Sequence, residues 1–99
     1  MTKTATNLAA RLTDPGLLVT QSYLAGLWSD ADDGATFEVT NPSRGDVNAH
    51  VADLGRAETE RAIDAAYAAQ KDWANWTGKE RAAVLRKWHN LMVAHADDL

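Results

Sequence analysis

The 99-residue chain contains no cysteine, and this absence removes several kinds of chemistry at once. Without cysteine the stretch has no disulfide framework, no thiolate nucleophile and no cysteine-ligated zinc site. No apolar run approaches the roughly 18 residues that are needed to cross a bilayer. A glycine-rich phosphate loop, a Gly-x-Ser-x-Gly nucleophile motif and a carboxylate pair with an obvious partner are also missing. The sequence therefore predicts no catalytic, cofactor-binding or metal-binding residue in this stretch.

The charged content is ordinary for a globular protein, with a small excess of acidic residues. Charged residues make up 24% of the chain, and the formal net charge is -4. This balance gives no electrostatic reason to bind nucleic acid or an anionic membrane. The start of the chain has no apolar signal core, and its lack of acids before Asp14 leaves a short transit peptide as the weaker alternative. We expect a cytoplasmic protein without nucleic-acid or membrane partners.

Residues 1–18 are predicted to be an N-terminal extension that contains a short helix. Leu8 and Leu12 have helical spacing, and Asp14-Pro15-Gly16 ends the pattern. This segment is expected to be separate from the strands that follow.

Residues 19–54 have the pattern of two β-hairpins. Ala25-Gly26 lies between two short apolar pairs and is typical of a tight turn. Residues 41–46 contain a proline and a glycine and predict a second turn. Val47, Ala49 and Val51 then alternate with polar residues, as in a strand with one weakly apolar side.

Residues 55–99 change to a helical period and are predicted to form a helical hairpin. The first helix begins near Ala57 and ends near Trp76, and Thr77 with Glu80 has the spacing of a capping box that starts a second helix. That helix carries an apolar stripe, which consists of Val84, Leu85, Trp88, Leu91, Met92, Ala96 and Leu99. No stop signal follows, so we expect the chain to be the opening part of a larger protein. The predicted fold class is an α+β fragment, with two β-hairpins and then a helical hairpin.

Three histidines and an acidic loop are the obvious candidates for metal binding, and their spacing argues against it. His89 and His95 are six residues apart, whereas metal-binding pairs on a helix are four apart. The loop at residues 30–34, Asp-Ala-Asp-Asp-Gly, resembles the start of a calcium loop, but the glycine and the final acid fall at the wrong positions. A packing or solvated role is therefore predicted for these two histidines, for His50 and for the loop.

Three further motifs have a structural explanation that is stronger than the functional one. Residues 44–46 spell the integrin tripeptide Arg-Gly-Asp, but they lie in a predicted turn. Residues 75–77 form a glycosylation sequon at a helix junction, in a chain without a signal peptide. The third motif is a group of basic residues beside Trp76 and Trp88, a combination that can bind nucleic acid. We expect these basic residues to flank the apolar stripe and to form a solvated face of the helix. They are Lys79, Arg81, Arg86 and Lys87.

The order of four motifs resembles the aldehyde dehydrogenase superfamily. Residues 23–28, Tyr-Leu-Ala-Gly-Leu-Trp, are similar to its (Ile/Val)-Asn-Gly-x-Trp element, with Ala25 and Leu27 as departures, and residues 40–46 are similar to its Asn-Pro-x-x-Gly turn. A helix of the Ala-Ile-Asp-Ala-Ala type, Trp73 and residues 80–85 follow at the family's spacing. Residues 77–92 and the final Asp-Asp-Leu most resemble succinate-semialdehyde dehydrogenases.

This resemblance implies an enzyme that oxidises succinate semialdehyde to succinate with NAD(P)+, through a cysteine thiohemiacetal and hydride transfer. It also implies an α/β fold with a Rossmann-like cofactor domain, a catalytic domain and an oligomerisation arm, assembled as a homo-oligomer. Residues 55–99 would form the N-terminal part of the cofactor domain. The family's catalytic cysteine, general-base glutamate, cofactor lysine and glycine motif have no counterpart here. We therefore expect the fragment to be inactive and to bind no cofactor, and the choice between NAD and NADP stays open.

A second hypothesis comes from a different class of function. The chain would be a free-standing binding module whose apolar stripe docks a partner helix or a dehydrogenase subunit.

Overall fold

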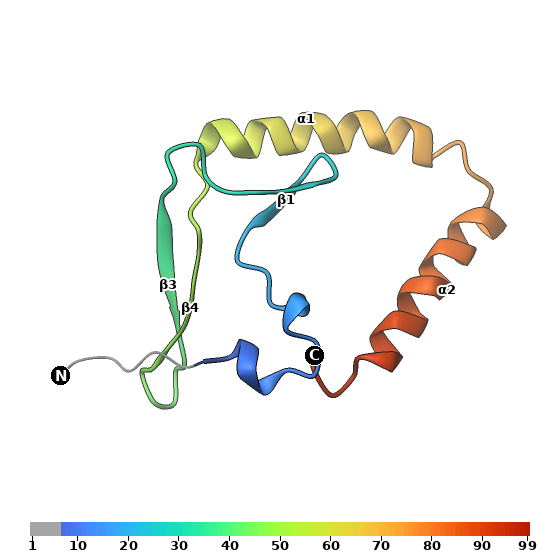
Figure 1. The fold of residues 1–99 in the computed structure, drawn as a ribbon. Helices are drawn as coiled ribbons and strands as arrows, with labels where there is room; N and C mark the ends of the chain where they lie inside the picture. Colours follow the sequence, from blue (N-terminus) through green and yellow to red (C-terminus); the bar gives the residue numbers. More distant parts are fainter. Residues whose placement is uncertain (1–6) are drawn as a thin grey trace.

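The computed structural model describes residues 7–99 as two short turns, two β-hairpins and two helices. The 3-10 turns are η1 (Ala9–Arg11) and η2 (Pro15–Leu17), and the strands are β1 (Ser22–Leu24), β2 (Leu27–Ser29), β3 (Thr36–Thr40) and β4 (Val47–Ala52). The helices are α1 (Arg56–Trp73) and α2 (Gly78–Ala94). In Figure 1 the β3–β4 hairpin descends from the start of α1, while α2 leaves its far end. These elements confirm an α+β fragment with two antiparallel strand pairs followed by two helices.

The N-terminal segment differs from the predicted short helix. Only η1 is helical around Leu8 and Leu12, and residues 1–6 lie outside the described part of the chain. The Asp-Pro-Gly sequence begins a second turn, because the Asp14 side chain accepts the Gly16 N–H and proline is favoured at the first helical position.

The first hairpin has the tight turn that its sequence predicts. Ala25 and Gly26 have φ angles of 49° and 84°, and positive φ at both central residues is the hallmark of a type I′ turn. The register pairs Tyr23 with Trp28, and their rings meet edge to face with centroids 5.1 Å apart. Cross-strand aromatic contact of this kind stabilises a pair of short strands.

The second hairpin also follows its sequence pattern. Val39 pairs with Ala49, and a bulge separates Val39 from Thr40 just before the turn. The turn closes with a 2.8 Å bond from the Asn41 N–H to the Asp46 carbonyl. Gly45 has a φ of 78°, which a side chain would disfavour.

The two helices are consecutive, as predicted, but they diverge instead of packing as a hairpin (Figure 1). Their four-residue connection is short enough for antiparallel packing. However, Trp73 and Trp76 pack against each other at this corner, with ring centroids 5.2 Å apart. The α2 helix points away from α1 (Figure 1).

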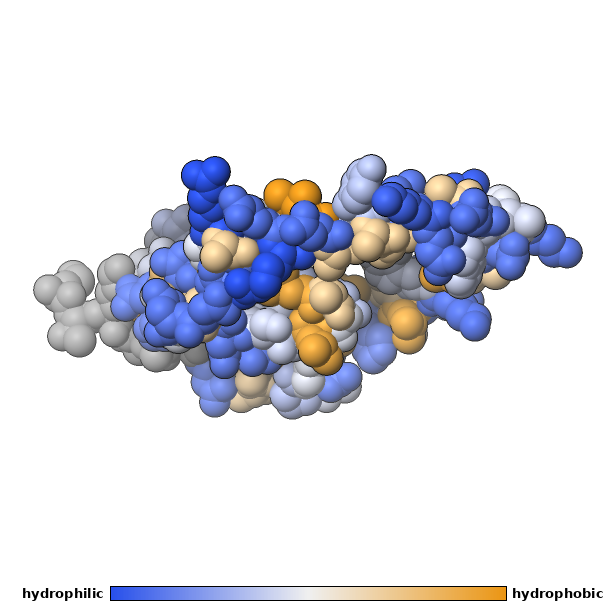
Figure 2. Space-filling view, turned by 90° about the horizontal axis from the view of Figure 1, so that it is seen from above, coloured by the Kyte–Doolittle hydropathy of each residue, from blue (hydrophilic) through white to orange (hydrophobic). Residues whose placement is uncertain are grey.

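The fragment has almost no core of its own. Among the described residues the buried apolar side chains are Ala31, 5% exposed, and Val47, 7% exposed. The radius of gyration is 17.2 Å, against about 13 Å for a compact domain of this length. The accessible surface is 7959 Å², against about 5,500 Å² for a compact protein of this mass. Figure 2 shows the result, with apolar side chains reaching the surface between polar ones.

Candidate functional site

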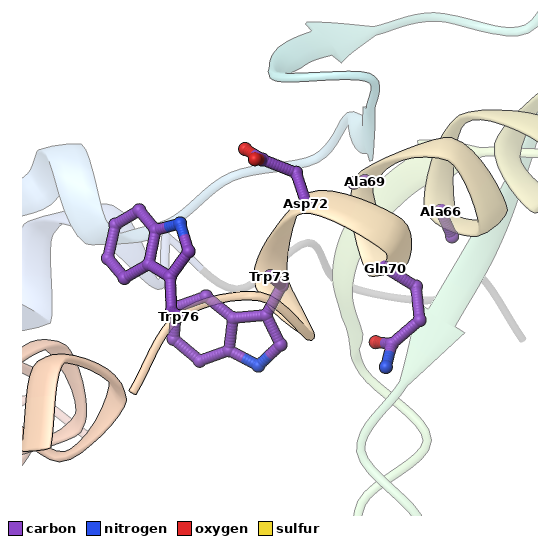
Figure 3. Close-up of a pocket in the computed structure, with 6 residues that line it drawn as sticks. All are labelled: Ala66, Ala69, Gln70, Asp72, Trp73 and Trp76. Carbon is purple, nitrogen blue, oxygen red and sulfur yellow. The ribbon is translucent and has the colours of Figure 1, made fainter. Parts of the chain in front are cut away.

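The corner between the helices contains an apolar hollow. It has a volume of about 470 Å³ and is lined by Ala66, Ala69, Gln70, Asp72, Trp73 and Trp76. Figure 3 shows the two indoles side by side, with the Gln70 and Asp72 side chains on opposite sides of α1. One carboxylate and one amide among apolar walls supply no nucleophile and no acid–base pair. The hollow suits apolar contact and not catalysis.

The apolar stripe of α2 continues away from this corner and is exposed along its whole length. Trp88 and Leu91 have 61% and 60% of their surface in solvent. A helix that buries one side normally covers its apolar stripe. Contiguous apolar surface of this kind marks an interface in a folded protein.

Arg81 lies in line with the apolar stripe and differs from what the sequence suggested. It precedes Leu85 by four residues and Trp88 by seven, so it shares their side of the helix. Its Nε atom is shielded from solvent and has no hydrogen-bond partner in the structure of residues 7–99. Arg81 was predicted to be one of the flanking, solvated cations, and its spacing of four residues from Leu85 is the signal that separates it from the other three.

The start of α2 is fixed by the predicted capping box. The Thr77 hydroxyl accepts the Glu80 N–H at 3.1 Å, and the Glu80 carboxylate accepts the Thr77 N–H at 2.9 Å. The hydrogen bonds from the backbone and then from the side chain of Thr77 lower the pKa of Glu80. The Thr of the sequon is thus used as a helix cap.

The acidic loop at residues 30–34 is fastened to α1 by its own side chains. An Arg61 guanidinium nitrogen donates to both carboxylate oxygens of Asp32, at 2.8 and 2.9 Å. Asp33 accepts the Ala35 N–H, and Asp30 accepts from the Gln21 amide. All three acids of the loop thus accept hydrogen bonds from the protein itself, and Asp32 attaches the loop to α1.

Glu58 completes this attachment from the first turn of α1. It is buried, and its carboxylate accepts the Asp32 N–H at 3.3 Å. Hydrogen bonds from its own amide and from those of Gly55 and Asp32 lower the pKa of Glu58. A carboxylate held at a helix N-terminus also complements the helix dipole.

The remaining sequence candidates lie apart from one another. His50 is 3.8 Å from Glu38 on the second hairpin, and His95 is the C-cap of α2. Arg44 and Asp46 form an ion pair of 3.1 Å, so the ends of the tripeptide bind each other. Within residues 7–99 no three His, Cys, Asp or Glu side chains are grouped so that they could hold a metal ion.

One contact that the sequence analysis missed joins the two ends of the described chain. The Asp98 carboxylate accepts the Thr13 N–H at 2.8 Å and the Asp14 N–H at 2.9 Å. These two bonds, the Thr13 amide first, lower the pKa of Asp98. No local sequence signal could have found a pairing across 85 positions.

No helix among the described residues has the length and hydropathy of a membrane span. Comparisons of the sequence and of the structure with known proteins identify the family. The model of the aldehyde dehydrogenase family matches residues 28–99. The 3-sulfolactaldehyde dehydrogenase of Pseudomonas putida is 49% identical over 88 residues, which are 89% of this chain and 18% of that protein. The NADP(+)-dependent succinate-semialdehyde dehydrogenase of Escherichia coli is 46% identical over 89 residues, which are 90% of this chain and 18% of that protein.

A solved structure gives the same result in three dimensions. Succinate-semialdehyde dehydrogenase from Burkholderia pseudomallei matches with a TM-score of 0.84 and 49% identity, over 88% of this chain and 18% of that one. The chain therefore spans less than a fifth of the length of these relatives, and the stretch that it matches is their N-terminal portion. This chain belongs to the aldehyde dehydrogenase family.

Proposed function

We propose that the chain is the N-terminal part of an NAD(P)-dependent enzyme that oxidises succinate semialdehyde to succinate. The observation that carries the proposal is the identity of 46% to a succinate-semialdehyde dehydrogenase over 90% of the chain. The 3-sulfolactaldehyde enzyme, at 49%, supports a wider class of substrate, a short aldehyde that carries an anionic group. In the reaction the aldehyde loses a hydride to NAD(P)+, water supplies the second oxygen, and two protons are released with the carboxylate.

The corner hollow does not suit the dinucleotide cofactor, and no step of the reaction is assigned to residues 7–99. The corner hollow offers Gln70 and one carboxylate, Asp72, and lacks the row of backbone donors that binds a pyrophosphate. The proposal therefore makes the fragment inactive by itself and places the cofactor on other parts of the enzyme. Residues 55–99 would begin the Rossmann-like cofactor domain of a cytoplasmic homo-oligomer, with no nucleic-acid or membrane partner.

The source DNA beyond the Leu99 codon tests this proposal. We expect an open frame that continues the helix and later supplies a cysteine nucleophile and a glutamate base. Its purified product should reduce NAD+ or NADP+ with succinate semialdehyde, and the 99-residue chain alone should not. A stop codon after Leu99, or turnover by the isolated chain, would contradict the proposal.

The alternative function is a free-standing binding module, and the exposure of Trp88 and Leu91 favours it. Such a module would associate with a partner helix or a dehydrogenase subunit in a concentration-dependent manner. Mixing should shift tryptophan fluorescence to the blue as Trp88 leaves water. A chain that stays monomeric with every candidate partner would exclude this function.

A further inference from the structure

We propose that Asp33 and Gly34 form a site of spontaneous covalent modification, at which the aspartate isomerises to isoaspartate, and that the attachment of the acidic loop to α1 slows this reaction. The loop, residues 30–34, lies in the connection from β2 to β3. The reaction needs no enzyme, metal or cofactor. It is therefore independent of the substrate that the proposed function assigns.

The sequence of the acidic loop sets its three aspartates apart. In this reaction the amide nitrogen of the following residue attacks the side-chain carboxyl carbon, and a Cβ atom on that following residue obstructs the approach. Glycine has no Cβ atom. Asp33 is the only aspartate of the chain that glycine follows, whereas Asp30 precedes alanine and Asp32 precedes aspartate. Asp33 is therefore the reactive position.

The chemistry is an isomerisation that passes through a cyclic imide. A bond forms between the Gly34 nitrogen and the Asp33 Cγ atom, and the carboxyl OH group leaves with the amide hydrogen as water. One water molecule then opens the ring at the backbone carbonyl carbon of Asp33. The backbone now runs through the former side chain, and the former backbone carbonyl is a free carboxylate. No electron is gained or lost, and the mass of the chain is unchanged.

The structure leaves both reacting residues open to water. Asp33 and Gly34 are exposed. Gly34 has a φ of 73°, and a methyl group added at its Cα atom would meet no heavy atom within 4 Å. The Asp33 carboxylate accepts the Ala35 N–H at 2.9 Å, a local bond that folds the side chain over the intervening backbone. The electrophilic carbon is thus held beside the peptide group with which it reacts.

The nucleophile, in contrast, is engaged in a turn. The Gly34 N–H donates to the Ala31 carbonyl at 2.9 Å. Ala31 is buried, at 5% exposed, so the turn is fixed where it begins. The Gly34 nitrogen must leave this hydrogen bond before it can form a bond to carbon. The reaction therefore requires local opening of the loop, and its rate follows the population of the open form.

Two contacts with α1 oppose this opening. An Arg61 guanidinium nitrogen donates to both carboxylate oxygens of Asp32, and the Glu58 carboxylate accepts the Asp32 N–H. Asp32 lies next to Asp33 in the turn, so both contacts hold the turn in place. The side chains of Arg61 and Asp32 are 56% and 59% exposed, and ion pairs in solvent contribute little. The ion pair alone should therefore change the rate by a small factor.

Ageing of the 99-residue chain tests the proposal. The chain and a synthetic peptide of residues 29–37 are incubated together at neutral pH. Isoaspartate is counted by enzymatic methylation of the freed carboxylate and located by fragmentation of the tryptic peptide 12–44. We expect isoaspartate at position 33, formed at least about tenfold more slowly in the chain than in the peptide. Equal rates, or isoaspartate at Asp30 or Asp32 instead, would overturn the proposal.

Two matched substitutions on α1 test the attachment. Arg61 and Arg56 each pair with a carboxylate, but the partner of Arg56 is Glu60 on α1 itself, at 3.0 Å. Arg61→Gln should raise the rate in the chain by about twofold to fivefold, as expected for the loss of an exposed ion pair. Arg56→Gln should leave the rate unchanged. Equal rates for the two variants would overturn the role of the attachment, and equal helical circular dichroism excludes loss of α1 as the cause.

A substitution at the reacting position itself tests the assignment of the site. In Asp33→Ser the hydroxyl oxygen can still accept the Ala35 N–H, but the side chain offers no carboxyl carbon. We expect the methylation signal of the chain to disappear. A signal that persists would overturn the assignment. None of these readouts involves an aldehyde, so a genomic product without dehydrogenase activity would refute the proposed function and leave the modification site standing.

Discussion

Ala25 carries the clearest local strain in the described chain. It is the non-glycine residue with a positive φ, at 49°, in the turn between β1 and β2. An L residue with a Cβ atom pays about 1 kcal/mol or more for this conformation. The Tyr23–Trp28 contact beside the turn holds the hairpin despite this cost. The family element has asparagine at this position, which tolerates positive φ.

Ala25→Asn should therefore stabilise the chain by about 0.5–1 kcal/mol, because asparagine is preferred in a type I′ turn. Urea unfolding followed by tryptophan fluorescence measures the change. Ala25→Val is the matched control and should destabilise the hairpin, since a β-branched residue is poorly accommodated at positive φ. If the two substitutions have the same effect, the turn is not strained at this position.

Asp98 makes the attachment between the N-terminal segment and the end of α2 dependent on pH. Its pKa is lowered in the folded chain by the Thr13 and Asp14 amides. The charged form is therefore favoured on folding, and the stabilisation is present above the unfolded pKa of the carboxyl group. It is lost as the pH falls through the lower, folded pKa. His95 adds an attraction to the Asp98 carboxylate, while Asp14 and Asp97 line the same hollow.

Hydrogen exchange of the Thr13 and Asp14 amides tests this attachment. Their protection factors should be high at about pH 7 and should fall toward about pH 3, where carboxylates become protonated. Asp98→Asn should lower protection already at neutral pH, because an amide offers one acceptor in place of two. Asp97→Asn should not. Protection that is independent of pH would contradict the assigned role of the carboxylate.

At the level of elements, the turns and caps were predictable because their signals are local. Thr77 and Glu80 indicated the start of α2, and Ala25-Gly26 indicated the first hairpin; the structure confirms both. The divergence of α1 and α2 was not predictable, because the direction in which a helix leaves a short connection is set by tertiary packing and carries no local sequence signal. The short helix predicted near Leu8 and Leu12 is the single 3-10 turn η1, and Asp14-Pro15-Gly16 begins the separate turn η2.

The capping box gives the prediction at this scale. Thr77→Ala should cost about 1 kcal/mol, because it leaves the Glu80 N–H without its acceptor. Helical circular dichroism of the isolated chain should fall, with the loss concentrated in α2. Thr77→Ser keeps the hydroxyl and should preserve the signal. Equal spectra for the alanine variant and the parent would show that α2 does not depend on this cap.

For the whole molecule, the sparse core predicts weak cooperativity. With two buried apolar side chains in the described chain, Ala31 and Val47, little surface changes its exposure on unfolding. The slope of unfolding free energy against urea should therefore be smaller for the isolated chain than for a compact domain of this length. A steep transition in the isolated chain would mean that it covers its apolar stripe by itself.

For the site, the sequence could predict only those features that appear as patterns along the chain. The apolar stripe was visible from its spacing, but its exposure was not, since the same pattern describes a buried helix. The family resemblance came from short motifs in order, and the comparisons confirm it. The attachment of residues 30–34 to Arg61 and Glu58 depends on tertiary contact between distant residues, so no periodicity could indicate it.

The packing of Trp73 against Trp76 also gives the molecule an optical property. Two indoles with centroids 5.2 Å apart and planes inclined by 39° couple their electronic transitions. Coupled chromophores produce paired bands of opposite sign in a circular dichroism spectrum. Because Trp73 ends α1 and Trp76 lies in the connection that follows, the bands record how this connection leaves the helix. The circular dichroism of this tryptophan pair can therefore report on the conformation of the connection without an attached dye.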